Sequence, residues 1–433
     1  MSQQEMNKGL TRREFLKGTA GITATLALSS LPVELFAHAQ GSDRIKVGLV
    51  GCGGRGTGAA MDCLRADAGV VIHALGDLFQ DRLDASCASL REEFKERADV
   101  PPERRFLGFD AYKQVIDSGV DLVLLCTPPA FRPLHFLYAV EAGKHVFMEK
   151  PVAVCPEGVR MILRGDEIVR QKRLAVVAGT QYRHHPGYIE AVRRIHEGQI
   201  GQLRAMYAYY NAGSPGVKPR QPDWSETVYQ LRNWLFYTWL AGDQPVEQFV
   251  HNIDAMTWIM GGVPKSAMAV GGRQVRTAPE YGDVYDHFAI EYEYPNGIRV
   301  LAMCRQWDNT AFRVSNTVVG SEGEALLEQF TNFYVRGKTR WEPDTRWPNP
   351  YVLEHQALIQ SLRKGEPINE TRQIAESTLT AIMGRMSAYT GKLVTWEQAL
   401  NSKLNLVERT FNLTYETPAY RDPVPIPGKT PLL

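Results

Sequence analysis

The sequence predicts an α/β protein with a parallel, doubly wound sheet in its first half and a mostly antiparallel sheet in its second. Three observations support this prediction. Short β-rich runs alternate with helical segments between about residues 44 and 178, which is typical of a parallel sheet. After about residue 200 the runs alternate in polarity or are aromatic-rich, as in antiparallel sheets. The length of 433 residues suits two domains.

The first half supplies the strands and helices of the parallel sheet. We expect strands at residues 45–50, 70–76, 121–126, 145–148 and 174–178. Segments of helical composition lie between them, at about residues 59–67, 81–97, 135–142 and 156–170. Gly143 follows the third of these segments, where a glycine favours the end of a helix.

The second half is expected to form the antiparallel sheet and its covering helices. Candidate strands lie at residues 203–210, 266–271, 287–294 and 298–304, with a turn at Pro295-Asn296-Gly297. Helices are expected at 353–363 and 371–390. Residues 213–226 are rich in proline and glycine and predict a long loop, which makes them a candidate lid.

Residues 1–39 have the three parts of an export signal. A positively charged segment, Thr11-Arg12-Arg13-Glu14-Phe15-Leu16-Lys17, precedes a short apolar stretch and the small-residue cleavage pattern Ala37-His38-Ala39. The paired arginines followed by Phe-Leu-Lys match the twin-arginine type, which carries folded proteins. We therefore expect a periplasmic protein that engages the twin-arginine export machinery. The other interpretation is a chance Arg-Arg pair before a buried helix.

Composition excludes several other classes. Lys and Arg total 49 against 48 Asp and Glu, so the chain lacks the positive excess of a nucleic-acid-binding protein. No uninterrupted apolar stretch reaches 18 residues, so no membrane span is expected. Six cysteines are too few for a disulfide scaffold and show no zinc-finger spacing.

A glycine loop follows the first expected strand. Gly51, Gly53 and Gly56 form a G-x-G-x-x-G pattern between a strand and a helix. This pattern allows a tight turn, lets the backbone approach a pyrophosphate and opens a helix whose N–H groups face it. Asp77 ends the second strand 21 residues after Gly56, where a carboxylate binds ribose hydroxyls and repels a 2′-phosphate. The pattern favours NAD over NADP. The alternative is a glycine-rich turn in an unrelated α/β protein.

Three further motifs extend this pattern. Cys126-Thr127-Pro128-Pro129 ends a strand and precedes His135, Glu149-Lys150-Pro151 follows another strand, and Glu247-x-x-x-His251-x-x-Asp254 opens an expected helix that contains Trp258. With the glycine loop, these motifs resemble the glucose–fructose oxidoreductase/inositol dehydrogenase (Gfo/Idh/MocA) family from about residue 44 to 390. The resemblance implies an N-terminal Rossmann domain, a C-terminal α/β domain with a large, mostly antiparallel sheet, and assembly as a homodimer or homotetramer.

This organisation divides the chain into four parts: a signal at 1–39, an NAD-binding domain at 40–170, a substrate-binding and oligomerisation domain at 171–395, and a tail at 396–433. The cofactor is expected to be NAD. The expected cofactor-binding residues are Gly51, Gly53, Gly54, Arg55, Gly56, Asp77, Thr127, Pro128, His135, Glu149 and Lys150.

The expected catalytic residues are Lys150, His251 and Glu247. Oxidation of a hydroxyl by hydride transfer must also move a proton, and Lys150 can donate or accept one, with the direction left open by its neighbour Glu149. His251 is a second proton carrier. Glu247 lies one helical turn before it and can orient it. The family more often has Asp at this position. By the resemblance, Lys150 and His251 contact the reacting hydroxyl.

The family resemblance implies that the loop after the strand at 174–178 borders the cofactor and substrate, so we expect substrate contacts there. Tyr182, Arg183 and His184 lie there, and Trp234 offers an aromatic face to a sugar ring. The alternative for this loop is a polar connection between domains. The adjacent His184 and His185 diverge in direction and have no third ligand nearby, so no metal is expected. Asp254 is equally a helix-surface, dimer or site residue.

Export and cofactor together leave three hypotheses. The first is an oxidoreductase of a sugar or polyol that is exported with bound NAD and recycles it on a second substrate. The second is a redox-neutral glycosidase or lyase that oxidises its substrate transiently, a pattern that some relatives resemble. Those relatives tend to lack the lysine of Glu-Lys-Pro, so Lys150 favours the first hypothesis. The third, a non-catalytic sugar sensor, is disfavoured by intact Lys150, Glu247 and His251.

Overall fold

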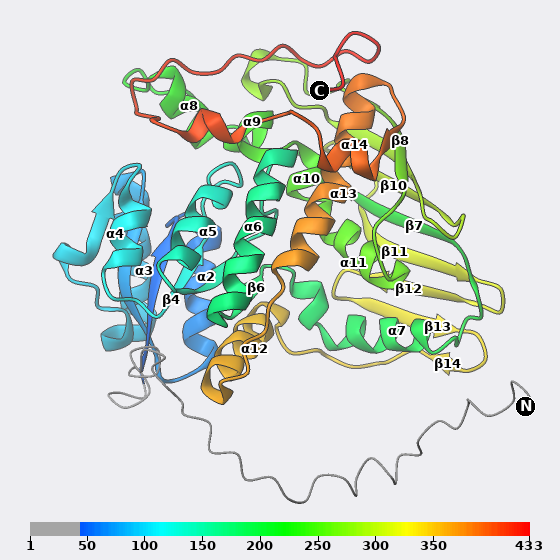
Figure 1. Cartoon of the computed structure of the whole chain (residues 1–433), viewed down its shortest axis with the longest axis horizontal. Coiled ribbons are helices and arrows are strands. Elements are labelled where there is room, and N and C mark those ends of the chain that lie inside the picture. Colours follow the sequence, from blue (N-terminus) through cyan, green and yellow to red (C-terminus); the bar gives the residue numbers. More distant parts are fainter. Residues whose placement is uncertain (1–43) are drawn as a thin grey trace, which may run out of the picture. The chain divides into compact units, whose positions relative to one another are not determined.

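Two sheets organise residues 44–433, the part of the chain that this computed structural model describes (Figure 1). The first sheet has six strands in the order β3-β2-β1-β4-β5-β6, and all its neighbouring pairs are parallel. The second has nine strands in the order β14-β13-β12-β11-β7-β10-β9-β8-β15, and only β7 and β10 pair in parallel. The predicted fold class is therefore confirmed. The expected export signal lies outside the described residues.

The parallel sheet has the strand order of a doubly wound dinucleotide-binding fold. Its central strand β4 is fully buried, because helices cover both faces of the sheet. The strands are β1 Ile45–Val50, β2 Val70–Asp77, β3 Arg105–Leu107, β4 Leu122–Leu125, β5 His145–Met148 and β6 Val176–Ala178. The helices are α2 Gly54–Ala66, α3 Gln80–Phe94, α4 Ala111–Asp117, α5 Arg132–Glu141 and α6 Pro156–Lys172, with short 3-10 turns at η2 Lys95–Ala98 and η3 Pro102–Arg104.

The second sheet buries one face and leaves the other open. Along β10, Val300, Ala302 and Cys304 are buried while Arg299 and Leu301 are exposed, the alternation expected of a one-sided sheet. Its strands are β7 Leu203–Ala212, β8 Ser266–Gly272, β9 His287–Glu293, β10 Arg299–Gln306, β11 Arg313–Gly320, β12 Glu324–Glu328, β13 Asn332–Arg336, β14 Arg340–Trp341 and β15 Val394–Thr395. Its helices are α7 Pro186–His196, α11 Val250–Met260 and α13 Thr371–Thr390, each of which packs against this sheet.

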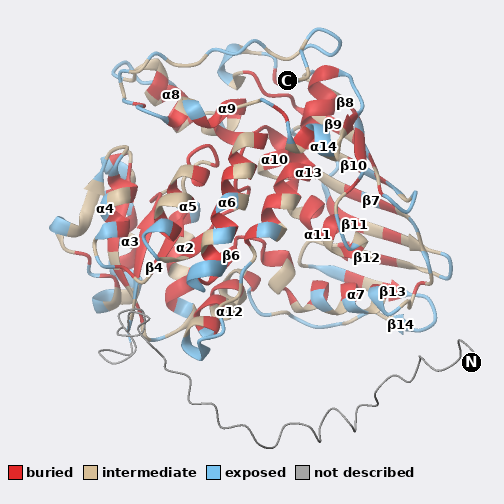
Figure 2. Ribbon diagram, in the orientation of Figure 1, coloured by how far each residue is buried: buried red, intermediate tan, exposed pale blue. Residues whose placement is uncertain are grey.

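Two helices from the C-terminal part of the chain pack against the helices and strands of the parallel-sheet half. Helix α12, Pro350–Lys364, packs against α2, and its Leu358 and Ile359 belong to the same buried cluster as Val47. Helix α13 is buried along most of its length and contacts both α6 and β8 (Figure 2). Residues 44–433 consequently form one compact unit. The domain boundaries expected after residues 170 and 395 stay predictions.

Short and irregular segments complete the chain. Residues 213–225 have no helix or strand, as expected of a long loop. A C-terminal tail, residues 401–433, is mostly irregular and runs beside α8 and α9 (Figure 1). No helix among residues 44–433 combines the length and apolar character needed to cross a membrane. The remaining elements are η4 Gln181–His184, α8 Glu226–Arg232, η5 Trp234–Phe236, α9 Thr238–Ala241, α10 Gln244–Glu247, η6 Pro279–Tyr281, α14 Trp396–Leu400 and η7 Val407–Thr410.

Candidate active site

The glycine loop joins β1 to α2 and is closed on one side and open on the other. Gly51 has φ 98°, a conformation that favours glycine. A Cβ at Gly56 would lie 1.8 Å from the Gly51 carbonyl oxygen, whereas a Cβ at Gly53 would meet no protein atom within 4 Å. The packed side holds the helix against the strand. The open side leaves room at the N-terminus of α2, where backbone N–H groups favour a phosphate.

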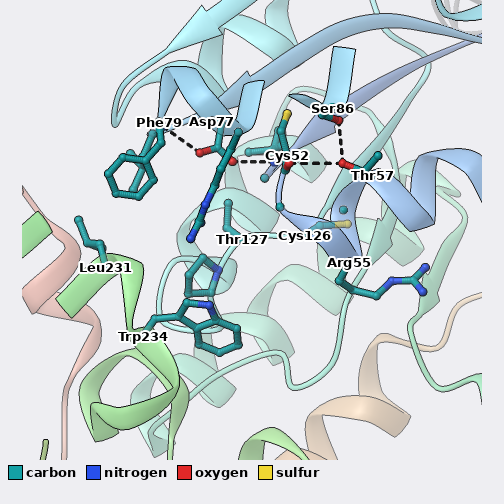
Figure 3. Close-up of a pocket in the computed structure, with 18 of the residues that line it drawn as sticks. Cys52, Arg55, Thr57, Asp77, Phe79, Ser86, Cys126, Thr127, Leu231 and Trp234 are labelled. Carbon is teal, nitrogen blue, oxygen red and sulfur yellow. Dashed lines mark hydrogen bonds between the residues drawn. The ribbon is translucent and has the colours of Figure 1, made fainter. Parts of the chain in front are cut away.

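Asp77 connects this loop to the end of β2. Its Oδ2 accepts the N–H of Cys52 at 2.6 Å, and its Oδ1 accepts the N–H of Phe79 at 2.9 Å (Figure 3). Burial raises the pKa of Asp77, while the N–H of Phe79 and the charge of Arg82 oppose that effect. The carboxylate that sequence reasoning assigned to a ribose thus also fixes the geometry of the loop.

A cavity of about 800 Å³ extends from this loop along the carboxyl ends of the parallel strands, and that volume lies within the range of ligand sites. All the expected cofactor residues line it except Glu149 and Lys150. Trp234 lines it too, from the segment after α8. The residues present fit a dinucleotide, because the open glycine loop, the carboxylate and the strand ends face one continuous space.

Glu149 contacts the glycine-loop helix through Arg55. The Nε of Arg55 lies 2.9 Å from Oε1 of Glu149, whose side chain is 8% exposed. The guanidinium of Arg55 also reaches Asp62 at 3.2 Å and lies 4.8 Å from the centre of the Tyr351 ring. Arg55 therefore links the first turn of α2 to the strand end that carries Lys150.

The Thr127 loop is supported by a buried histidine. The ring of His135 stacks on Tyr112 with centroids 4.0 Å apart, and its Nδ1 lies 3.3 Å from the Thr127 hydroxyl. Burial, and secondarily the charge of Arg132, lowers the pKa of His135 to about 3. This histidine is neutral at physiological pH and supports the loop as a neutral hydrogen-bonding group.

Arg132 is a site residue that sequence reasoning missed. Its guanidinium is buried and donates to the carbonyl oxygens of Pro151 and Thr127. Burial lowers its pKa to about 10, which leaves it charged at neutral pH. It joins the loops that carry Thr127 and Lys150. No local motif marks this role, because Pro151 is 19 residues away in the chain.

Lys150, Glu247 and His251 come together as expected, but not on one continuous helix. Lys150 Nζ donates to the backbone oxygen of Glu247 at 2.6 Å and lies 3.4 Å from its Oε1. The N–H of His251 bonds to the oxygen of Gln248. Helix α10 ends at Glu247 and α11 begins at Val250. The expectation that Glu247 opens the helix of His251 was wrong.

Asp243 stabilises the short helix α10 that precedes the break between α10 and α11. This residue caps α10 and has φ 67° and ψ 171°, a conformation that is costly for a residue with a side chain. Its carboxylate accepts hydrogen bonds from the N–H of Gln244 and Tyr285 and from the hydroxyl of Tyr389. These three bonds hold the short helix that presents Glu247 to Lys150.

His251 presents a buried imidazole beside Lys150. Burial, and then the charges of Lys150 and Arg55, lowers its pKa well below the ordinary value, so its imidazole is neutral. Its Nδ1 is buried and has no hydrogen-bond partner within residues 44–433. Its ring lies 5.4 Å from the ring of Tyr182. A neutral imidazole beside an ammonium group is a pair suited to proton transfer with a hydroxyl.

The expected substrate residues lie in different surroundings. Tyr182 stacks on Tyr188 and faces His251. Arg183 pairs with the buried Asp254 at 2.8 Å, and His184 Nε2 lies 3.1 Å from Glu370. Only Tyr182 of these three contacts a catalytic candidate through its ring. Within the described part of the chain, no group of three or more His, Cys, Asp or Glu side chains could hold a metal ion.

Two family models match most of the described chain. An oxidoreductase-family model described as an NAD-binding Rossmann fold matches residues 45–179, and a GFO/IDH/MocA C-terminal-domain model matches residues 188–326. The first match places the glycine loop, Asp77 and Lys150 within an NAD-binding domain. The second includes Glu247 and His251.

Individual relatives have low sequence identity to this chain, but the similarity covers most of both proteins. Inositol 2-dehydrogenase of Cereibacter sphaeroides is 24% identical over 331 residues, which cover 74% of this chain and 86% of that protein. The aldose–aldose oxidoreductase of Caulobacter crescentus, solved with glycerol, has a TM-score of 0.64 at 17% identity and covers 81% of this chain and 99% of that one. WlbA dehydrogenase of Bordetella pertussis, solved with NADH and UDP-GlcNAcA, has a TM-score of 0.63 at 18% identity, covering 81% and 98%.

Proposed function

The chain belongs to the Gfo/Idh/MocA oxidoreductase family, and we propose that it oxidises a hydroxyl of a sugar or polyol with an NAD that stays bound and is recycled in the site. The observation that carries this proposal is the cluster of Lys150, Glu247 and His251, which is connected to the glycine-loop cavity through Glu149 and Arg55. The similarity to inositol dehydrogenases supports the substrate class.

The proposed reaction balances as follows. The glycine loop and Asp77 would hold NAD⁺, which would supply the acceptor for a hydride leaving the substrate carbon. The proton of that hydroxyl would pass to His251, whose imidazole is neutral and has an unpartnered Nδ1 among the described residues, while Lys150 would donate a hydrogen bond to the same oxygen. In the second half-reaction a carbonyl compound, such as an aldose or ketose, takes the hydride and the proton. The second substrate thereby restores NAD⁺.

Glu247 positions rather than reacts in this scheme. Its backbone oxygen and Oε1 both face the Lys150 amine, so the ammonium is directed by two acceptors. The Arg55–Glu149 ion pair, with 2.9 Å between Nε and Oε1, holds the other side of the same strand end. Orientation of this kind is a large part of what a site contributes to rate.

Export is the second part of the proposal. The twin-arginine pattern at Arg12 and Arg13 supports passage through the twin-arginine machinery after folding around NAD, and thus a periplasmic location. Fractionation of cells that express the protein or its Arg12→Lys, Arg13→Lys variant tests this. Equal periplasmic amounts of the two proteins would overturn it.

We also expect copies of the chain to associate through the open face of the nine-stranded sheet. Met268 and Val270 on β8 are 61% and 71% exposed, and Tyr207 and Leu301 lie exposed on β7 and β10. Exposed apolar side chains gathered on one face mark an interaction surface. A Val270→Glu variant should sediment as a smaller species than the wild type. Unchanged sedimentation would exclude β8 from the interface.

An assay without added cofactor tests the central proposal. Purified mature protein is examined for bound dinucleotide by absorbance and mass, and then incubated with sugar pairs or with aryl glycosides. Reduction of one sugar with oxidation of another supports the proposal. Release of the aryl group without net reduction of the cofactor would replace it with the redox-neutral glycosidase. Absence of any bound dinucleotide would contradict cofactor retention.

A further inference from the structure

The wall of the cofactor cavity opposite the glycine loop comes from the second half of the chain. We call residues 213–236 the strap. Leu231 and Trp234 of the strap face Asp77 and Thr127 across the cavity (Figure 3). The strap residues that line the cavity are Gly216, Lys218, Leu231, Arg232, Asn233, Trp234, Leu235 and Phe236. The candidate lid expected at residues 213–226 thus contributes Gly216 and Lys218 to this wall.

The strap is fastened to the nucleotide-binding sheet by Arg232. The two terminal nitrogens of its guanidinium each lie 2.8 Å from a carboxylate oxygen of Asp81, in the first turn of α3. The same guanidinium lies 3.9 Å from the centre of the Phe79 ring. A two-point contact of this kind fixes orientation as well as distance. The positive charge of Arg232 is thereby already paired with the Asp81 carboxylate.

The C-terminal tail fastens the strap from behind (Figure 1). Ser225 donates to the backbone oxygen of Tyr415 at 2.6 Å, and Gln230 donates to that of Tyr420 at 2.8 Å. Tyr415 in turn donates its hydroxyl to the Leu78 carbonyl oxygen beside Asp77. Strap, tail and the end of β2 are therefore one connected structure over the adenosine end of the cavity.

Two cations line this cavity without a direct ion pair in the described part of the chain, although the charges of Asp77 and Asp81 favour the charged form of Arg82 and that of Asp81 favours the charged form of Lys218. Among residues 44–433, neither the Arg82 guanidinium nor the Lys218 amine forms a hydrogen bond or an ion pair, and both side chains line the cavity. The backbone of Lys218 is fixed by Asn233, whose Oδ1 accepts its N–H at 2.7 Å and whose Nδ2 donates to its oxygen at 3.1 Å.

The electrostatics agree with the geometry. Burial, and then the charges of Arg82 and Arg232, lowers the pKa of Lys218. Burial also lowers the pKa of Arg82. Arg232 is already paired with Asp81, and the carboxylate of Asp77 is already bonded to two N–H groups. Cations that converge on a cavity and disfavour each other are stabilised by a bound anion.

We propose that Arg82 from the nucleotide-binding half and Lys218 from the strap together bind a phosphate group of the dinucleotide, so that the strap retains the cofactor. The inference rests on the proposed function, since it assigns residues to the retention of the same cofactor. Two groups of a dinucleotide carry the negative charge that these cations would bind: the adenosine-side phosphate of the pyrophosphate and the 2′-phosphate of NADP. A charge-assisted hydrogen bond from Lys218 would add a direct contact between the strap and the bound cofactor.

Binding of NAD and of NADP to protein freed of cofactor distinguishes the two sources. We expect Lys218→Ala and Arg82→Ala each to weaken dinucleotide binding about tenfold or more. If the variants lose affinity for NAD and NADP equally, Arg82 and Lys218 bind the pyrophosphate. If they lose affinity for NADP alone, the two residues bind the 2′-phosphate. Lys218→Arg, which keeps the charge, should retain most of the affinity.

The matched control is Lys403→Ala, which removes the same charge from an exposed position outside the cavity. It should leave both affinities unchanged. If wild type binds NAD, and Lys218→Ala and Arg82→Ala bind both NAD and NADP as tightly as wild type does, the inference is overturned and the proposed function stands. Failure of the wild type to bind either dinucleotide would instead count against the proposed function. Thermal unfolding of each variant without cofactor separates a binding loss from a folding loss.

Discussion

The two walls of the cofactor cavity are built in different ways. One wall consists of the glycine loop, Asp77 and Thr127, which lie at the ends of neighbouring parallel strands. The other is the strap, held by a tail about 190 residues later in the chain. The first wall depends on local backbone geometry and the second on contacts between distant segments. We therefore propose that the first wall sets the shape of the dinucleotide site and the second wall retains the cofactor, while the catalytic candidates Lys150 and His251 lie outside both walls.

The catalytic cluster gives the sharpest test of this division. Lys150→Ala and His251→Ala should each lower kcat by about 10²–10⁴, the scale for removal of a positioned acid or base. Bound cofactor should remain, because neither side chain lines the dinucleotide cavity. Single-turnover reduction of the bound NAD, followed by absorbance, provides the measurement. If a variant loses bound cofactor as well as activity, the substituted side chain also holds the dinucleotide, and the separation of catalysis from cofactor binding is wrong.

The glycine loop offers three substitutions with different expected outcomes. Gly56→Ala should destabilise the fold by about 1–3 kcal/mol or more, because its Cβ would lie 1.8 Å from the Gly51 oxygen. Gly53→Ala should leave the fold intact and weaken dinucleotide binding, since its Cβ enters the open side of the loop. Urea unfolding and dinucleotide titration separate the two effects.

Gly58→Ala is the matched control for this series. Its Cβ would come no closer than 3.8 Å to any atom, namely a terminal nitrogen of Arg55. Because alanine favours a helix over glycine, this variant should be more stable than wild type by about 0.4–1 kcal/mol. Equal losses of stability in Gly53→Ala and Gly56→Ala would contradict the assignment of an open and a closed side.

Acid should weaken the fold through buried neutral histidines, of which His135 supports the first wall. Burial lowers the pKa of His135 and His355 to about 3 and that of His185 to about 4. Their folded pKa lies below the unfolded value of about 6.5, so only the unfolded chain gains protons between those values. Stability therefore falls as pH drops below about 6.5, by about 1.4 kcal/mol per pH unit for each such histidine.

His355→Leu provides the measurement for this effect. His355 is fully buried against Phe147, and neither ring nitrogen has a partner within the described residues. The variant should lose less stability than wild type between pH 7 and pH 5 in urea unfolding. An unchanged slope would exclude His355 as a source of acid sensitivity.

Local patterns made much of the fold and half of the site predictable. The expected bounds 145–148 and 371–390 match β5 and α13 residue for residue. The strands β11 to β14 were missed; β11 has Ser315, Asn316 and Thr317 in succession and β14 is two residues long, so neither has a clear apolar alternation. The tight turn that needs Gly51 and the lysine beside Pro151 were visible because each motif lies within a few residues.

The missed site residues share a different property. Arg132 acts on carbonyl groups up to 19 residues away, Lys218 faces Arg82 across the cavity, and Tyr415 contacts a residue 337 positions earlier. Nothing local constrains such side chains, since their roles exist only after the chain is folded. Arg183, a polar loop residue expected to meet substrate, pairs with Asp254 in the fold, and its contact with substrate stays a prediction.

The smallest expected effect concerns the second wall. Tyr415→Phe removes the hydroxyl that donates to the Leu78 oxygen and keeps the ring against Phe109, whose centroid lies 5.0 Å away. Loss of one such hydrogen bond costs about 0.5–1.5 kcal/mol. We therefore expect cofactor release to quicken by at most about tenfold, with hydride transfer unchanged. Release is followed by trapping the freed dinucleotide after dilution.

Tyr420→Phe is the matched control, because no hydrogen bond of the Tyr420 hydroxyl is present among residues 44–433, while its backbone oxygen still accepts from Gln230. If the tail holds the strap through Tyr415, only the first variant releases cofactor faster. Equal release from both variants would mean that the glycine-loop wall alone retains the dinucleotide. A slower hydride step in Tyr415→Phe would mean that the second wall also shapes the chemistry, and the division between the two walls would fail.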